Sequence, residues 1–232
     1  MKSNSCVYLV SPRPAFDEKS VMPVDPLDSS DTAFLLGSLI LNSNEILSAL
    51  PKNVQLIYCF DEKDGGSLPS ALTESRASIV LRNSDDVYKS VRSLAEKHID
   101  DFGAQLFVFS NSIGFSVSDI KKALSLLTLE DETIVLGKSN NHMTSFIGFN
   151  SYNPMLIRQI DWANPEYDHV LKSIGQYDEF LYVLGNYIAL NGVNDFKQLY
   201  KELSKKESLV YCSQEMHERF THLFIEYKEL LK

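Results

Sequence analysis

The order of strand-like and helix-like segments predicts an α/β fold with a doubly wound, mostly parallel sheet. Short apolar runs alternate with helical patterns at the spacing of β-α-β crossovers. The 232 residues are 44% hydrophobic and 23% charged, so the chain can bury a sizeable core. After residue 162 helical patterns dominate. We therefore expect an α/β domain over residues 1–162 and a helical C-terminal extension over residues 163–232 that packs on it.

Six apolar runs are predicted as strands, because each is short, rich in β-branched or aromatic residues and bounded by turn residues. These runs cover residues 6–10, 54–60, 78–81, 105–109, 133–136 and 145–149. The segment between the last two runs is too short for a helix, so one of them is expected to run antiparallel.

Helices are expected between these strands, where apolar residues recur at helical spacing. The first covers residues 32–50 and ends at Pro51. A second runs to about Phe102, with its N-cap candidates at 83–86. Ser116 and Asp119 have the spacing of a capping box that opens a third helix.

The C-terminal tail reads as three helices over residues 168–190, 195–205 and 214–231. The last is clearly amphipathic, because its apolar residues recur along one face. The tail is rich in aromatic residues that suit self-association. A homo-oligomer through the C-terminal helices is therefore considered beside ordinary packing of these residues in the core.

Charge and cysteine content limit the partners. The formal net charge is −9 and no basic face is visible, which argues against nucleic-acid binding. No apolar run is long enough to predict a membrane span, and the N-terminus has no signal-peptide pattern. Cys6, Cys59 and Cys212 are an odd and widely spaced set, which favours a reduced, cytoplasmic protein.

Common catalytic motifs are absent. There is no dinucleotide-binding glycine pattern, no P-loop and no nucleophile elbow. His217 and His222 resemble a zinc-protease helix, but a separation of five places them about 140° apart around the axis. We interpret them as ordinary residues of an amphipathic helix.

Acidic residues gather in two loops. Asp25, Asp28 and Asp31 could ligate a cation, but Asp28 or Asp31 is more simply a helix N-cap. Asp61 and Asp64 flank a Gly-Gly turn, where aspartate is common for purely local reasons.

Two loops that follow strands carry a family resemblance. They are Leu-Phe-Val-Phe-Ser-Asn-Ser-Ile-Gly-Phe at 106–115 and Ile-Val-Leu-Gly-Lys-Ser-Asn-Asn-His-Met-Thr-Ser-Phe-Ile-Gly-Phe at 134–149. In this order they resemble a bacterial GT-A-like family of the glycosyltransferase type, found in radical-SAM and selenoprotein gene contexts. That family is similar to nucleotide-diphospho-sugar transferases and nucleotidyltransferases. The resemblance covers residues 6–162 in element order, and in residue detail only these two loops.

The family patterns are hydrophobic-G-S-D-C-P-G-L after the fourth strand and V-L-G-P-A-x-D-G-G-Y-Y-L-I-G in the next segment. Ser110 and Gly114 match the first pattern, and Gly137 and Gly148 match the second. The resemblance implies binding of a nucleotide sugar, with Ser110 among the residues that contact it.

This sequence departs from the family at three places. Asn111 and Asn141 stand where the family has aspartates, and His142-Met143 replaces two glycines. Because the family's carboxylates hold a divalent cation, these changes imply a degraded metal site that binds Mg²⁺ or Mn²⁺ weakly at most. Asn111, Asn141 and His142 would then contact the nucleotide or sugar directly.

Basic residues are the candidates for the ligand's phosphates. Arg13 and Lys19 lie in the loop after the first strand, where the family has a basic loop, and Lys138 could replace the charge of the metal. Two hypotheses stay open. One is a glycosyltransferase-like protein that binds a nucleotide sugar, and the other is a non-catalytic scaffold or partner-binding module with the same fold.

Overall fold

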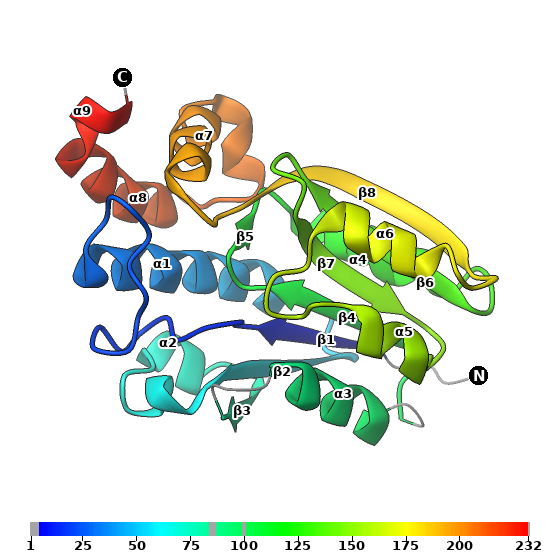
Figure 1. The fold of residues 1–232 in the computed structure, drawn as a ribbon. Helices are drawn as coiled ribbons and strands as arrows, with labels where there is room; N and C mark the ends of the chain where they lie inside the picture. The colour runs from blue at the N-terminus through cyan, green and yellow to red at the C-terminus, as the bar shows by residue number, and fades with distance from the viewer. Residues whose placement is uncertain (1–4, 84–86, 99–100, 232) are drawn as a thin grey trace.

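A computed structural model describes residues 5–83, 87–98 and 101–231 of the chain. At its centre is an eight-stranded sheet with the order β3-β2-β1-β4-β7-β6-β8-β5, and helices cover both of its faces (Figure 1). The strands are β1 Ser5–Val10, β2 Val54–Asp61, β3 Ser78–Arg82, β4 Ala104–Phe109, β5 Ser112–Ile113, β6 Thr133–Ser139, β7 Thr144–Phe149 and β8 Phe180–Ala189.

The helices of the first part of the chain are α1 Ser29–Ser48, α2 Ser70–Thr73, α3 Val87–His98, α4 Val117–Leu126 and α5 Pro154–Gln159. Those of the C-terminal part are α6 Tyr167–Ile174, α7 Val193–Leu203, α8 Gln214–Glu226 and α9 Lys228–Leu231. Two short 3₁₀ helices, η1 Glu62–Gly66 and η2 Lys206–Val210, complete the structure. In the described ranges, no helix combines the length and apolar character that crossing a bilayer requires.

The half of the sheet formed by β3, β2, β1 and β4 is parallel, which confirms the predicted class. Ser5 of β1 lies opposite Val54 of β2 on one side and Ala104 of β4 on the other. Every residue of β4 is buried, as the continuous apolar run of a strand covered on both faces requires. The carboxyl ends of these strands therefore meet at one edge of the sheet.

The other half contains the expected antiparallel strand. β7 runs antiparallel to both β4 and β6, and only four residues separate β6 from β7. β6 is consequently parallel to β4, so its carboxyl end lies at the same edge as those of β1 to β4.

Caps set the helix starts where the sequence indicated them. The Asp28 carboxylate accepts from the Asp31 N–H at 2.8 Å, so Asp28 is the N-cap of α1. Ser116 and Asp119 form the predicted capping box of α4. Of the cap candidates at 83–86, Asn83 is described and residues 84–86 lie outside the described residues.

The expected helix over residues 168–190 is wrong. α6 ends at Ile174, and residues 180–189 form strand β8, which pairs in parallel with β6. Tyr182, Val183 and Ile188 belong to residue types that favour strands, and β6 offers them an edge to pair with. An apolar run alone does not separate a buried helix from a strand, so the tertiary partner decided the outcome.

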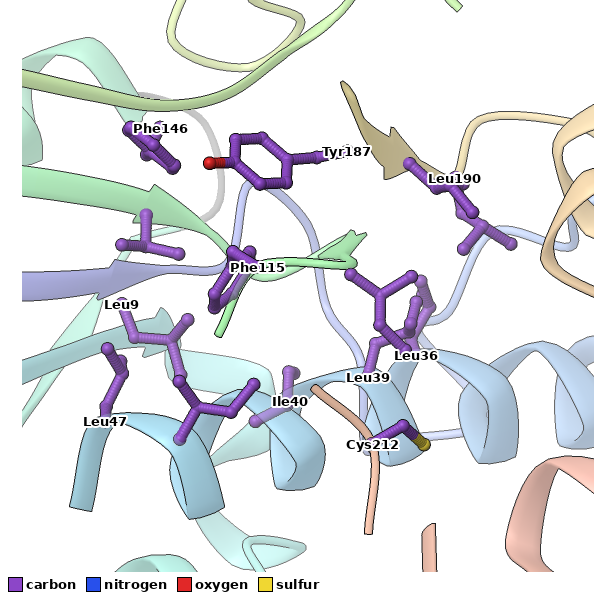
Figure 2. Packing of buried hydrophobic residues seen from close by; sticks show 14 of the residues in the cluster. Leu9, Leu36, Leu39, Ile40, Leu47, Phe115, Phe146, Tyr187, Leu190 and Cys212 are labelled. Carbon is purple, nitrogen blue, oxygen red and sulfur yellow. The ribbon is translucent and has the colours of Figure 1, made fainter. Parts of the chain in front are cut away.

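The remaining tail helices agree with the sequence. α7 and α8 correspond to the predicted helices, except that the last one is interrupted at Tyr227 before α9. α1 is covered by the sheet on one side and by α8 on the other, and its apolar residues share one core with β5, β8 and Cys212 (Figure 2). Cys6, Cys59 and Cys212 are all free and buried, as small hydrophobic residues usually are.

Candidate functional site

The candidate site lies at the carboxyl edge of the sheet, where the loops after β1, β2, β4 and β6 meet. In α/β sheets this edge is where ligands bind. The loop after β1 covers residues 11–28 and contains Arg13 and Lys19. The loop after β4 contains Ser110 and Asn111, and the loop after β6 contains Asn141 and His142.

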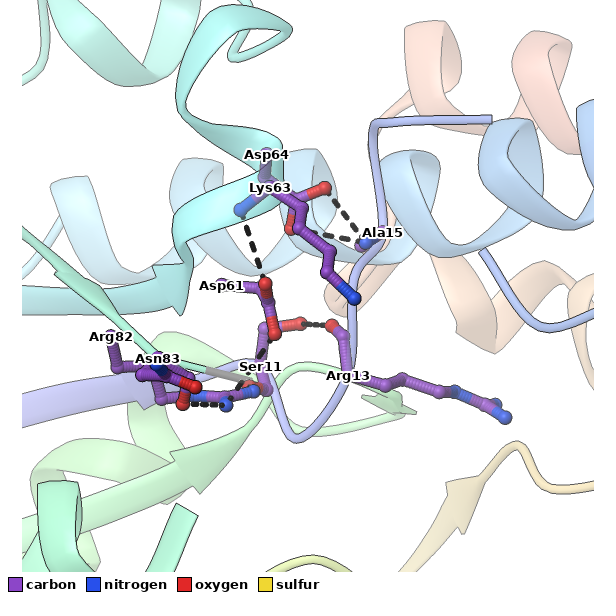
Figure 3. Close-up of polar contacts among 8 residues, drawn as sticks. All are labelled: Ser11, Arg13, Ala15, Asp61, Lys63, Asp64, Arg82 and Asn83. Atoms are coloured by element: carbon purple, nitrogen blue, oxygen red, sulfur yellow. Dashed lines mark hydrogen bonds and ion pairs between the residues drawn. The ribbon is translucent and has the colours of Figure 1, made fainter. Parts of the chain in front are cut away.

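A buried carboxylate holds the loop after β1 in place. Asp64 lies in η1 directly after β2, and its oxygens accept from the N–H groups of Ala15 at 3.0 Å, Phe16 at 2.7 Å and Asp17 at 3.1 Å (Figure 3). Successive N–H groups that converge on one anion form a nest. Burial raises the pKa of Asp64, and the three N–H donors oppose that shift. The expectation of a purely local role for Asp64 is therefore wrong.

A second buried group ties the loops of β1, β2 and β3 together. Arg82 at the end of β3 lies 3.5 Å from the Asp61 carboxylate at the end of β2. Its Nη2 atom also donates to the Ser11 carbonyl at 2.6 Å. Asp61 keeps its expected local role as well, because it accepts from the Lys63 N–H. Both carboxylates at this side of the edge are thus engaged by protein groups.

Arg13 differs from these engaged charges. Its side chain extends away from Asp61 and Lys63 (Figure 3), and the residue as a whole is half-buried. The Nη2 atom is buried and has no hydrogen-bond partner in the part of the chain that the structure describes. Burial lowers the pKa of Arg13. A buried N–H donor of a cationic group is costly without a partner, so this position suits an anionic ligand. Lys19, in the same loop, is exposed.

Asn111 and Asn141 are brought together at the end of β8. The Asn111 Nδ2 atom donates to the Leu190 carbonyl at 3.2 Å, and the Asn141 Nδ2 atom donates to the Ala189 carbonyl at 2.5 Å. The two amides therefore bind consecutive carbonyls of one segment. An aspartate at either position could not donate in this way when ionised, because a carboxylate only accepts.

Next to these amides lies an open surface pocket that we call the asparagine cup. It has a volume of about 420 Å³ and is lined by Asn141, Met143, Asn191, Gly192, Val193, Asn194 and Asp195. Asp195 is engaged, since it accepts from the N–H groups of Asn191 and Gly192 at 2.9 and 3.0 Å. Asn111 reaches the cup through a 3.3 Å hydrogen bond to the Asn191 side chain. The cup thus presents the neutral amides of three asparagines beside the apolar side chains of Met143 and Val193.

Sequence reasoning missed Asn191 and Asn194. The segment Asn-Gly-Val-Asn at 191–194 is a turn signal between a strand and a helix. It went unrecognised as part of a site because residues 168–190 were expected to be helical, which hid the end of a strand at residue 189.

The other predicted site residues lie around this region. Ser110 is buried, and its N–H donates to the Val10 carbonyl at 2.9 Å. The Lys138 ammonium lies 4.8 Å from the centre of the Tyr167 ring. His142 is exposed, with a φ of 61° and its ring 3.8 Å from the Asp168 carboxylate. No contact joins His142 to the amides of the cup within the described residues.

The glycines that match the family patterns have packing reasons. Gly114 has a φ of +102°, a conformation that favours glycine. A Cβ on Gly137 would lie 2.6 Å from the Phe146 ring, and one on Gly148 would lie 2.9 Å from Leu106 and Leu127. Backbone conformation and packing therefore explain why these glycines match the family patterns, and the matches are not evidence for an activity.

The side chains at positions 111 and 141 are poor ligands for a divalent cation. Across residues 5–83, 87–98 and 101–231, no group of three or more His, Cys, Asp and Glu side chains is placed to hold a metal. Asn111 and Asn141 offer only neutral oxygens, and the Asn141 oxygen already accepts from Ser139 at 2.6 Å. Mg²⁺ and Mn²⁺ sites are usually built on carboxylates, so this donor set does not fit them.

Comparisons with solved structures agree with the fold. A protein from Desulfovibrio desulfuricans G20, assigned as a nucleotide-diphospho-sugar transferase, is 19% identical with a TM-score of 0.73 over 100% of this chain and 97% of its own. The 4-diphosphocytidyl-2C-methyl-D-erythritol synthase of Anaerococcus prevotii is 10% identical, with a TM-score of 0.55 over 87% of this chain and 99% of its own.

A cytidylyltransferase from Leptospira borgpetersenii is also 10% identical, with a TM-score of 0.52 over 100% of this chain and 97% of its own. No protein-family model matches the sequence, and no curated protein matches it. The chain therefore has the fold of nucleotide-diphospho-sugar transferases.

Proposed function

We propose that this protein binds a nucleotide sugar at the carboxyl edge of its sheet. The observation that carries the proposal is the buried Nη2 atom of Arg13, which has no hydrogen-bond partner among the described residues. Arginine suits phosphate because its planar fork can donate two hydrogen bonds to one group. The fold supports the ligand class, since the structural neighbours are named as nucleotide-sugar and nucleotidyl transferases.

The asparagine cup is proposed to hold the neutral part of the ligand. Side-chain amides both donate and accept, so they match the hydroxyl groups of a sugar or ribose. Asn191 and Asn194 are more exposed than Asn111 and are the better candidates for direct contact. In this arrangement Asn111 and Asn141 position the end of β8 rather than bind the sugar themselves.

Binding is proposed to be independent of a divalent cation. Arg13 would supply the positive charge that neutralises the phosphates, with Lys19 adding long-range attraction from the same loop. Ligand affinity should therefore be the same with Mn²⁺ and with a chelator.

The test is a thermal-shift series with UDP-, GDP-, CDP- and dTDP-sugars, with and without Mn²⁺. A bound ligand raises the melting temperature by mass action. For the best ligand, Arg13→Gln should weaken binding roughly tenfold or more, because a charge-assisted contact is lost. Lys19→Gln is the matched control and should change affinity much less, since Lys19 is exposed. The absence of a shift with every sugar nucleotide at millimolar concentration would contradict the proposal.

A non-catalytic binding module is the second candidate. It is favoured by the engagement of Asp61, Asp64 and Asp195 with protein groups, which leaves none of these three as a ready general base. The two candidates differ in turnover. A module would bind the sugar nucleotide without releasing nucleoside diphosphate or monophosphate, whereas a transferase would release one of them when an acceptor is present.

A further inference from the structure

Strand β8 has one open side along most of its length. Residues 180–184 pair with residues 133–137 of β6, and on the other side only Ile188 and Ala189 pair with β5. Among the described residues, the segment 180–186 therefore has a strand neighbour on one side only. Figure 1 shows β8 running along the outer margin of the sheet beyond β6.

The direction of the main-chain groups follows from the pairing. The Phe180 N–H donates to the Glu132 carbonyl at 3.0 Å, so residue 180 directs its groups toward β6. Successive residues of a strand direct these groups to opposite sides. Leu181 and Val183 therefore present their N–H and C=O groups on the open side.

The side chains of this strand do not protect the edge. Phe180 is 57% exposed and Val183 is 45% exposed, although both are large and apolar. The ten residues Phe-Leu-Tyr-Val-Leu-Gly-Asn-Tyr-Ile-Ala contain no charged residue and no proline, in a chain that is 23% charged. Natural proteins block free edges with charges, prolines or very short strands.

The opposite end of the sheet shows such protection. β3 has five residues and ends at Arg82. The shortness of β3 disfavours pairing with another chain. β8 has ten residues, so its open side lacks the protection that a very short strand gives.

We propose that β8 pairs antiparallel with β8 of a second copy of this chain and joins the two sheets into one. A two-fold axis at Tyr182 would place Leu181 of each copy opposite Val183 of the other. The main-chain N–H and C=O groups of these two residues face outward, so each copy would provide hydrogen-bond partners for the other. The strand is uncharged, so two chains of net charge −9 can meet there without like charges in the pairing. Gly185, with a φ of +101°, ends the regular pairing on one side.

The experiment is sedimentation equilibrium of the full chain from low micromolar to submillimolar concentration. Wild-type protein should be a dimer. Val183→Lys should weaken the dimer roughly tenfold or more, because it places a charge at the centre of the interface. Val183→Pro should do the same, since it removes an N–H that points away from β6. Circular dichroism should show both variants folded, because Val183 is half exposed and makes no N–H bond to β6.

Two controls locate the interface. Val183→Thr keeps a β-branched, uncharged residue and should remain dimeric. Ile225→Lys changes an exposed residue of α8, which is 65% exposed, and should also remain dimeric. A wild-type monomer over the whole range, a dimer that survives Val183→Lys unchanged, or a dimer lost in Ile225→Lys would each overturn the proposal.

Discussion

The two sides of the carboxyl edge are held by different chemistry. On the side of β1, β2 and β3, buried charges fix the loops. Asp64 accepts hydrogen bonds from three N–H groups, and Arg82 forms an ion pair with Asp61. On the side of β6 and β8, side-chain amides fix the loops, because Asn111 and Asn141 donate to the carbonyls of Leu190 and Ala189. A charged ligand group is therefore best received near the first side, where Arg13 has an unpartnered nitrogen. A neutral, hydroxyl-rich group fits the second side.

The largest expected effect tests the charged side. Asp64→Ala removes the acceptor of three converging N–H groups and should lower the free energy of unfolding by about 3 kcal/mol, measured by urea denaturation. Glu62→Ala, an exposed change in the same short helix, is the matched control and should have little effect. Equal losses in the two variants would show that the nest does not stabilise the loop.

The next effect tests the amide side. Asn111→Asp introduces the residue that the resembling family has, yet the new carboxylate would face the Leu190 carbonyl instead of donating to it. We expect a loss of about 2 kcal/mol in the free energy of unfolding near neutral pH. Because burial and the carbonyl would raise the pKa of the new carboxyl in the folded state, the loss should shrink as the pH falls through that raised pKa.

Asn194→Asp is the control for this substitution, because Asn194 is an exposed residue of the same cup. Its stability should stay close to that of the wild type at every pH. If Asn111→Asp proved as stable as Asn194→Asp, then the hydrogen bond to Leu190 would not distinguish an amide from a carboxylate at this position.

The smallest effect concerns a carboxylate away from both sides. Glu179 precedes β8, its Oε2 atom is buried without a hydrogen-bond partner in the described ranges, and burial raises its pKa. A raised pKa in the folded state means that this group favours folding at low pH, and that its contribution is lost as the pH rises through the folded-state pKa. Glu179→Gln should therefore raise the melting temperature by about 1–2 °C near neutral pH, after allowance for partial exposure.

The measurement is the melting temperature against pH for the wild type and for Glu179→Gln. The two curves should converge at acidic pH, where the wild-type carboxyl is protonated. A difference that stayed constant across the range would show that titration of Glu179 is not the cause.

The sequence predicted the parallel half of the sheet well, because strands buried on both faces are continuous apolar runs that local pattern detects. It failed at residues 180–189, where pairing with β6 decides between helix and strand. The nest of Asp64 and the asparagine cup join segments far apart in the chain. Local spacing contains no signal for such contacts, although the family resemblance implied that Asn111 and Asn141 belong to one site.

The late position of β8 in the chain has a consequence for synthesis. β6 emerges from the ribosome well before residues 180–189, so until then its free side has no native partner. An unpaired apolar strand is a site for wrong association. The nascent chain therefore passes through a stage in which completion of the sheet depends on residues 180–189, and premature termination before Phe180 would yield a product prone to aggregation.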